Sequence, residues 1–176
     1  RRLKTARAVI SLLIGIVAAV CLFTTMVIGL SPDLPEWGLF DIGTPSITGT
    51  ASDNPADESV TIEGGGLGFE GTNDEGTFLY RVLSRGESVS SKLLSNPHDG
   101  GGGEQAGLML RSSLDSDSAS HLVAVAADGG VAAIWRPVTG ESTIEVPLPG
   151  LFSTDWYRLV ADPTTAYLYH SADGTT

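Results

Sequence analysis

The stretch that decides the fold class is WYRLVA, residues 156–161. Its residues alternate, so that Trp156 and Arg158 would share one face of an extended chain and Tyr157 and Leu159 the other. Successive side chains point to opposite faces in a strand, whereas a helix repeats every 3.6 residues. The pattern therefore predicts a strand with one face in a core.

The same kind of pattern recurs outward along the chain. AGLMLR (106–111) alternates small and large apolar residues, and no 11-residue window after residue 45 shows helical periodicity. Gly, Pro, Asn and Asp clusters separate the strand patterns, as turns do. We expect an all-β fold, an antiparallel sandwich without crossover helices. The expected strands are 46–51, 59–63, 77–83, 88–94, 106–112, 120–126, 131–136, 142–146, 156–161 and 166–170.

The composition excludes several classes of protein. The 176 residues include a single Cys, which rules out a disulfide-stapled scaffold or a four-thiolate metal site. The net charge is −11, and all 21 acidic residues but only six of the ten basic ones lie after residue 30. Nucleic acid needs a basic surface, so we expect no nucleic-acid partner.

The first 30 residues have a different character. Arg1, Arg2, Lys4 and Arg7 form a basic tail over 1–7, and no charged residue follows until Asp33. The apolar stretch 8–30 would span about 34 Å as a helix, enough for a hydrocarbon core of about 30 Å. It predicts one transmembrane α-helix before the β-domain. By the positive-inside rule, the N-terminus would be cytoplasmic and the C-terminal domain periplasmic or extracellular.

A signal peptide or a lipoprotein anchor fits this stretch less well. A signal peptide has an apolar region of about 7–15 residues, shorter than this one. A lipoprotein would need a small residue before Cys21, where Val20 stands. The span contains no ionisable residue, so it offers no proton relay or ion path. Gly15 and Ala18 could let a partner helix approach closely, although small residues are common in any membrane helix.

A connector over 31–45 is expected between the helix and the domain at 46–176. It carries Trp37, Leu39 and Phe40, which are too apolar for a free linker. These side chains would either lie at the membrane interface, where Trp is enriched, or pack on the domain or on a partner.

Five segments resemble a known family: DIGTPSITGTA (41–51), VTIEGGGLGFEG (60–71), QAGLMLRSSLD (105–115), WYRL (156–159) and YLYHSADGTT (167–176). The family is that of concanavalin A-like jelly-roll modules of bacterial surface proteins, related to the laminin-G and glucanase superfamily. The resemblance implies an antiparallel jelly-roll β-sandwich. In that family a Trp usually follows the last turn and starts a further strand, which this sequence either lacks or receives from elsewhere.

Acidic loops are the only metal candidates. Asp115 and Asp117 offer two carboxylates at one-residue spacing, and residues 73–75 (NDE) offer three oxygen donors. Calcium takes six to eight oxygens and is often bound by such loops. The alternative is a solvated acidic turn. No other cofactor is expected.

The sequence lacks a catalytic constellation. The Glu-x-Asp-x-x-Glu run of jelly-roll glucanases is absent, and Glu141 and Glu145 would lie about 13 Å apart on a strand. His98, His121 and His170 have no Gly-x-Ser-x-Gly elbow beside them. We therefore expect no enzyme activity.

Two functions remain. The first is a non-catalytic accessory or scaffold subunit in the cytoplasmic membrane, whose sandwich docks on partner subunits of a photosynthetic or respiratory assembly. Its contacts would be Gly15, Ala18, Trp37, Leu39 and Phe40, and its partners the bilayer and other membrane subunits. The second is a cell-surface carbohydrate-binding module. Its platform would draw on five aromatic residues, Trp135, Trp156, Tyr157, Tyr167 and Tyr169.

Overall fold

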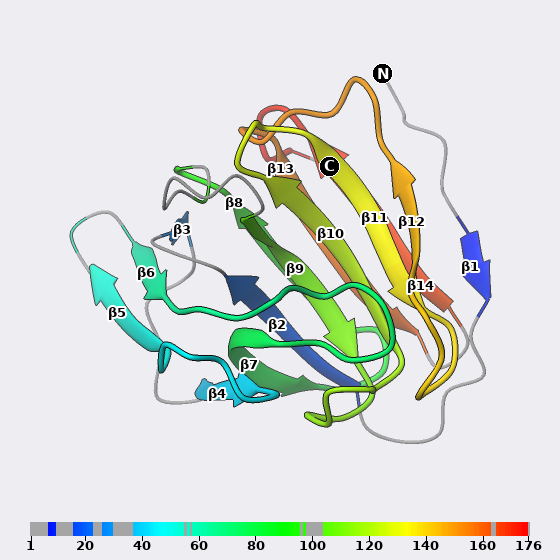
Figure 1. The fold of residues 1–176 in the computed structure, drawn as a ribbon. Helices are drawn as coiled ribbons and strands as arrows, with labels where there is room; N and C mark the ends of the chain where they lie inside the picture. The colour runs from blue at the N-terminus through cyan, green and yellow to red at the C-terminus, as the bar shows by residue number, and fades with distance from the viewer. Residues whose placement is uncertain are drawn as a thin grey trace.

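The computed structural model describes residues 7–9, 16–22, 26–29, 37–54, 56, 58–95, 97, 104–162 and 165–175. Within these ranges every regular element is a β-strand, and every strand pair is antiparallel. The predicted all-β class is confirmed. Figure 1 shows the strands gathered into layers that face one another.

The largest sheet has seven strands, in the order β12-β11-β10-β9-β2-β7-β4. Its edges are β12 and β4, and β2 lies between β7 and β9. Its strands are β12 (Ile144–Pro147), β11 (Val131–Arg136), β10 (Ser120–Ala126), β9 (Gln105–Arg111), β2 (Ile16–Leu22), β7 (Gly76–Leu83) and β4 (Gly38–Ile42).

Two smaller sheets accompany it. One has the order β1-β14-β13-β8 and the other the order β3-β6-β5. The four-stranded sheet contains β1 (Arg7–Val9), β14 (Thr165–Ser171), β13 (Trp156–Asp162) and β8 (Ser88–Lys92). The three-stranded sheet contains β3 (Met26–Gly29), β6 (Ser59–Glu63) and β5 (Thr50–Asn54).

The predicted strand boundaries agree closely with these elements. The ranges 59–63, 120–126 and 131–136 coincide with β6, β10 and β11. The largest displacement is that of 46–51, since β5 begins at Thr50. Here Gly49 donates its backbone N–H to Asp41 at 3.1 Å, which holds the chain in a loop before the strand starts.

The N-terminal segment differs from the expectation where it is described. Strands β2 and β3, and residues 8 and 9 of β1, fall inside the range 8–30 for which a helix was expected. A continuous apolar run suits a buried central strand as well as a helix, and periodicity cannot separate the two. The remaining residues of the segment, including Gly15, lie outside the described ranges. Those ranges hold no helix with the length and apolarity needed to span a bilayer.

The expected connector also contributes to the sheet. Residues 38–42 form β4, which pairs with β7 through Phe40 opposite Phe78. Trp37 packs against the main core, and the Arg81 guanidinium lies 5.7 Å from its ring centre. Trp37 therefore belongs to the domain, whereas Leu39 and Phe40 stay substantially exposed.

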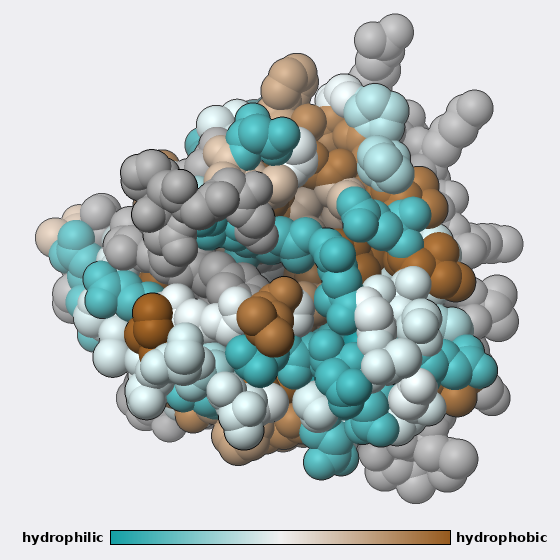
Figure 2. Space-filling model, in the orientation of Figure 1, coloured by the Kyte–Doolittle hydropathy of each residue, from teal (hydrophilic) through white to brown (hydrophobic). Residues whose placement is uncertain are grey.

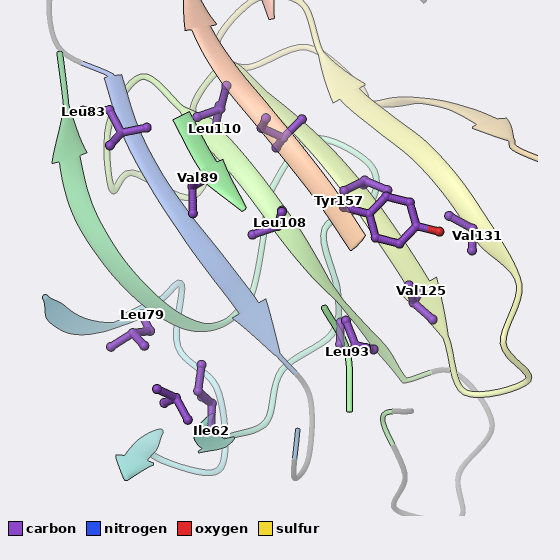
Figure 3. Packing of buried hydrophobic residues seen from close by; sticks show 14 of the residues in the cluster. Ile62, Leu79, Leu83, Val89, Leu93, Leu108, Leu110, Val125, Val131 and Tyr157 are labelled. Atoms are coloured by element: carbon purple, nitrogen blue, oxygen red, sulfur yellow. The ribbon is translucent and has the colours of Figure 1, made fainter. Parts of the chain in front are cut away.

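The main core fills the space between the seven-stranded sheet and the two smaller sheets. Figure 3 shows its side chains converging from strands of all three sheets, with Tyr157 and Val131 near one end and Ile62 and Leu79 near the other. Burying such side chains is the principal favourable term in folding.

A second, smaller core lies on the opposite face of the seven-stranded sheet. Met109, Leu122 and Ile134 pack there against Phe69, which comes from the segment between β6 and β7. Figure 1 shows this segment passing in front of the sheet on its way from β6 to β7. On that side of the molecule the hydrophobic surface is broken into separate patches by hydrophilic residues (Figure 2). The loop thus acts as a third layer over part of the sheet.

Candidate functional site

The middle residue of the acidic segment 73–75, Asp74, takes part in a buried ionic cluster. Asp74 is 1% exposed and pairs with Arg111 at 3.0 Å and with Arg136 at 2.6 Å. Both arginines are buried and reach Asp74 from β9 and β11. Because Asp74 lies in the segment that covers the second core, this ionic cluster fastens the covering segment to the sheet.

Most other bonds of the two guanidinium groups go to backbone carbonyls, and Arg111 also donates to the Met109 sulfur at 3.4 Å. Arg111 donates to the carbonyls of Ser113 and Asp115, and Arg136 to those of Gly71, Glu141, Ser116 and Ser118. Such charge-assisted bonds hold the surrounding turns in place. The Asp74 carboxylate is committed to these arginines and is not free to bind a metal.

The predicted calcium residues lie in the turn between β9 and β10. Asp115 accepts a hydrogen bond from the Ser113 hydroxyl at 2.9 Å, and the Asp117 carbonyl accepts one from the Gly140 N–H at 2.9 Å. In the described part of the chain, no three His, Cys, Asp or Glu side chains gather as a metal site would require. Calcium binding by Asp115 and Asp117 stays a prediction.

The acid and histidine candidates for catalysis are scattered. Glu141 and Glu145 are exposed; Glu141 precedes edge strand β12 and Glu145 lies on it. Burial lowers the pKa of His121 to about 4, and its Nε2 atom has no hydrogen-bond partner. His170 lies 3.3 Å from the carboxylate of Asp155. His98 lies outside the described residues. Among the described residues, the structure does not bring these acids and histidines together.

The predicted partner contacts Leu39 and Phe40 lie on β4, the last strand of the seven-stranded sheet. They are 40% and 41% exposed, and no described strand pairs with the outer edge of β4. Gly38 stands opposite Tyr80, and a Cβ at this position would lie 2.8 Å from the Tyr80 ring. The glycine therefore lets the Tyr80 ring lie across the edge strand. We call the four residues Leu39, Phe40, Tyr80 and Val82 the β4 edge patch.

The β4 edge lacks the exposed charged side chains that usually prevent a further strand from pairing. Asp41 is the only charged residue of β4, and its carboxylate accepts bonds from the Gly49 N–H and from the Thr77 hydroxyl at 2.9 Å. By contrast, the opposite edge strand β12 carries Glu145 and ends at Pro147. Charged residues and proline are the usual protection of an edge strand against further pairing.

A second candidate lies on the outer face of the four-stranded sheet. Tyr157 and Leu159 of β13 point into the main core, so Trp156 and Arg158 point away from it. Arg158 stands opposite Tyr169 of β14, and its guanidinium carbon lies 4.9 Å from the Tyr169 ring centre. A hollow forms around these groups, and its lining includes Ser90, Trp156, Arg158, Tyr169, Ser171 and Gly174. We call it the Arg158 hollow.

The turn after β14 forms one wall of the hollow. Gly174 has a φ of 78°, and a Cβ there would lie 3.0 Å from the indole Nε1 of Trp156. Asp173 accepts bonds from the Thr175 hydroxyl and N–H and from the Ser171 hydroxyl, and these bonds, that of the Thr175 hydroxyl first, lower its pKa to about 2. The turn expected from SADGT is thus present, with its glycine in the left-handed region.

Arg158 lines the hollow and has one unsatisfied donor. Its Nε atom is buried and has no hydrogen-bond partner within the described structure. An unsatisfied buried donor is costly and is often met by water or a ligand. The sequence shows Arg158 directly after two aromatic residues in an acid-rich chain. It does not predict a binding role for this side chain, because alternation alone does not separate a solvated arginine from a ligand-binding one.

The aromatic residues expected on a sugar-binding face fall into two groups. Tyr157 belongs to the core, and its hydroxyl donates to the Phe152 carbonyl at 2.7 Å. Burial, with a smaller contribution from Asp155, raises its pKa. Trp156 and Tyr169 line the hollow, and Tyr167 stands opposite Val160 on the same outer face. Trp135 is half-buried on β11, in the seven-stranded sheet.

No family model, curated protein or solved structure matches this chain. Function has to be inferred from the geometry of the β4 edge patch and the Arg158 hollow.

Proposed function

We propose that the protein is a non-catalytic accessory or scaffold subunit that docks on partner subunits of a larger membrane assembly, photosynthetic or respiratory. The observation that carries this proposal is the β4 edge patch. An edge strand presents unpaired N–H and C=O groups, and here exposed apolar side chains flank them. A partner strand added to β4 would gain both kinds of contact, as in β-strand addition.

The occupant we favour is an extended strand of another subunit. Phe40, Tyr80 and Val82 share one face of the sheet by register, and Val82 is 68% exposed. Leu39 projects to the other face, so a paired strand could place apolar side chains on both sides. Aromatic residues at the centre of such a contact contribute most of its binding energy.

A pair of matched double variants tests the docking. Leu39→Lys with Phe40→Lys places charge on the β4 edge. Ile144→Lys with Val146→Lys places it on the β12 edge, where the side chains are 46% and 43% exposed. The tagged chain is purified in mild detergent from its source membrane. We expect the β4 variant to lose stoichiometric partner subunits, and the β12 variant to keep them.

Two results would overturn the docking proposal. One is equal retention of partners by both double variants. The other is a purified wild-type chain that forms a dimer by sedimentation, which the β4 variant abolishes while partner retention is unchanged. In that case the edge joins two copies of this chain.

Membrane attachment is the second part of the proposal. The apolar stretch 8–30 and the basic residues before it support a single span with a cytoplasmic N-terminus. Residues 16–22 cannot lie in the bilayer and in the sheet as β2 at once. Resistance of the full chain to alkaline carbonate extraction would support the span. Complete extraction would favour the β2 position, and protease treatment of spheroplasts would test the orientation.

We assign the finer topology, a concanavalin A-like jelly roll, on the sequence resemblance of the five segments between residues 41 and 176. An experimental structure of residues 41–176 whose strand order is not that of a jelly roll would refute it.

Carbohydrate binding is a second candidate function, and the Arg158 hollow favours it. Trp156 and Tyr169 face outward around a shallow depression whose lining also includes Ser90 and Ser171. Aromatic rings next to hydrogen-bonding groups suit a sugar, which has both apolar C–H faces and hydroxyl groups. Binding of soluble glycans that depends on Trp156 would support this function.

A further inference from the structure

We infer that the Arg158 hollow binds a saccharide that carries a carboxylate, such as a uronic acid unit of an anionic polysaccharide. The inference rests on the second candidate function and adds the chemical class of the ligand. It places the site on the outer face of the four-stranded sheet, on the side away from the main core.

The aromatic residues provide the surface for the sugar ring. Trp156 is half-buried and Tyr169 is 39% exposed, so each keeps part of its ring accessible. Packing of Gly174 against the indole fixes Trp156 on one side. A preformed platform of this kind binds with little loss of side-chain freedom.

Arg158 provides the site for the carboxylate. Its guanidinium lies over the Tyr169 ring, which holds the planar group in a defined orientation. No acidic side chain of the described residues pairs with this guanidinium, and its two terminal nitrogens match the two oxygens of a carboxylate. A neutral sugar hydroxyl would accept only one, weaker bond.

The surrounding charges favour an anion at this place. Only six basic residues follow residue 30, and two of them, Lys92 and Arg158, lie on this face. Lys92 stands opposite Trp156 across the β13–β8 pair, and Ser90 stands opposite Arg158. These two cations and the Ser90 hydroxyl lie beside the hollow, whereas the acidic residues on this side are Asp162, four residues farther along β13, and Asp173 in the turn after β14.

The neighbouring acidic residue, Asp173, forms no ion pair with Arg158 in the described structure. Asp173 lies in the neighbouring turn, and its carboxylate is held by Ser171 and Thr175. Among the described residues, the ion pairs of acidic groups involve Arg111, Arg136 and His170, and none involves Arg158. The guanidinium is therefore available to a ligand.

Calorimetric titration of the full chain in detergent micelles tests the inference. The probes are oligogalacturonate and the same oligomer with its carboxylates methyl-esterified. We expect the carboxylated oligomer to bind at least about tenfold more tightly, and Arg158→Gln to remove that difference. Trp156→Ala should weaken binding of both oligomers. Arg85→Gln is the matched control, since it removes an exposed cation in the β7–β8 turn and should leave affinity within about twofold.

The outcomes separate the inference from the function on which it rests. Equal binding of both oligomers, weakened by Trp156→Ala but unaffected by Arg158→Gln, would keep the carbohydrate function and overturn the anionic class. Binding of neither oligomer would overturn both. Equally tight binding of a poly-glutamate peptide, with the same dependence on Arg158, would replace the saccharide by an acidic peptide. Unfolding curves of each variant show whether the fold is retained.

Discussion

Three arginines in the described structure lie over aromatic rings, and two of them, Arg111 and Arg158, have contrasting surroundings. The Arg111 guanidinium is 5.6 Å from the Phe78 ring centre, and that of Arg158 is 4.9 Å from the ring centre of Tyr169. Arg111 is fully buried and bonds to Asp74 and to backbone carbonyls. Arg158 is half-buried on an outer face, and its Nε donor has no partner in the described structure.

The difference separates a structural arginine from one available for binding. A buried charge is tolerated when a counter-charge and hydrogen bonds replace its hydration, and Arg111 and Arg136 receive both from the Asp74 cluster. Arg158 is half-buried, lies over the Tyr169 ring and has no carboxylate partner among the described residues, so we expect its contribution to the stability of the fold to be small. Variants that add or remove charge in these two kinds of surroundings should therefore differ widely in stability.

The largest effect is expected in the ionic cluster. Asp74→Asn keeps the shape of the side chain but leaves two buried arginines without their counter-charge. Removing one partner of a buried ion pair costs about 3–5 kcal/mol. Urea unfolding should therefore give a large fall in the free energy of unfolding. Glu145→Gln, which neutralises an exposed carboxylate, is the control and should change it little. A loss below about 1 kcal/mol for Asp74→Asn would show that the cluster does not stabilise the fold.

His121 gives the second effect, because its burial lowers its pKa to about 4. The unfolded chain, with a His pKa near 6.5, binds a proton that the folded chain does not between these values. The stability due to neutral His121 is thus fully present above pH 6.5 and is lost as the pH falls toward 4. The loss is at most about 3 kcal/mol, at 1.36 kcal/mol per pKa unit.

Urea unfolding at several pH values between 4.5 and 7.5 measures this loss. The variant His121→Gln cannot titrate there, so its stability should depend less on pH than that of the wild type. Parallel curves for the two proteins over the whole range would show that His121 is not the group responsible.

A smaller effect on stability is expected at the β4 edge. Leu39→Lys with Phe40→Lys adds two charges, but each side chain is about 40% exposed and its ammonium group can reach water. The free energy of unfolding should fall by no more than about 1 kcal/mol. A thermal unfolding scan beside the β12 double variant measures it. A loss several times larger would mean that these residues serve the core rather than a partner.

The smallest effect on stability is expected at Arg158. Arg158→Gln removes a half-buried cation without a carboxylate partner, and such changes alter stability by about 0.5 kcal/mol or less. Unfolding by urea should nearly coincide with that of the wild type. A loss comparable to that of Asp74→Asn would assign Arg158 a structural role and weaken the binding proposal.

Local alternation makes much of this fold predictable. The range 156–161 is recognisable because Trp156 and Arg158 would share one face of a strand and Tyr157 and Leu159 the other. In the structure, β13 occupies residues 156–162. The N-terminal segment has no such alternation. An apolar run such as IVAAVCL in β2 carries no period that distinguishes a central strand from a helix.

The candidate sites are less predictable, because they depend on contacts distant in sequence. Asp74 meets Arg136 across 62 residues, and no local pattern links them. The apolar character of Leu39 and Phe40 predicts contact residues, but their place on an edge strand follows only from the sheet order. Arg158 becomes a candidate only once its register with Tyr169 is known.

The most direct test of the central claim follows the two arginines in one experiment. Nuclear magnetic resonance can observe the Nε–H signals of arginine side chains while galacturonate oligomer is added to the full chain in micelles. The account predicts that the Arg158 signal shifts with saturation, whereas that of Arg111, whose Nε–H donates to the Ser113 carbonyl at 2.6 Å, stays in place. An unmoved Arg158 signal, or an equal shift of the exposed Arg85, would contradict the claim that Arg158 is the binding arginine.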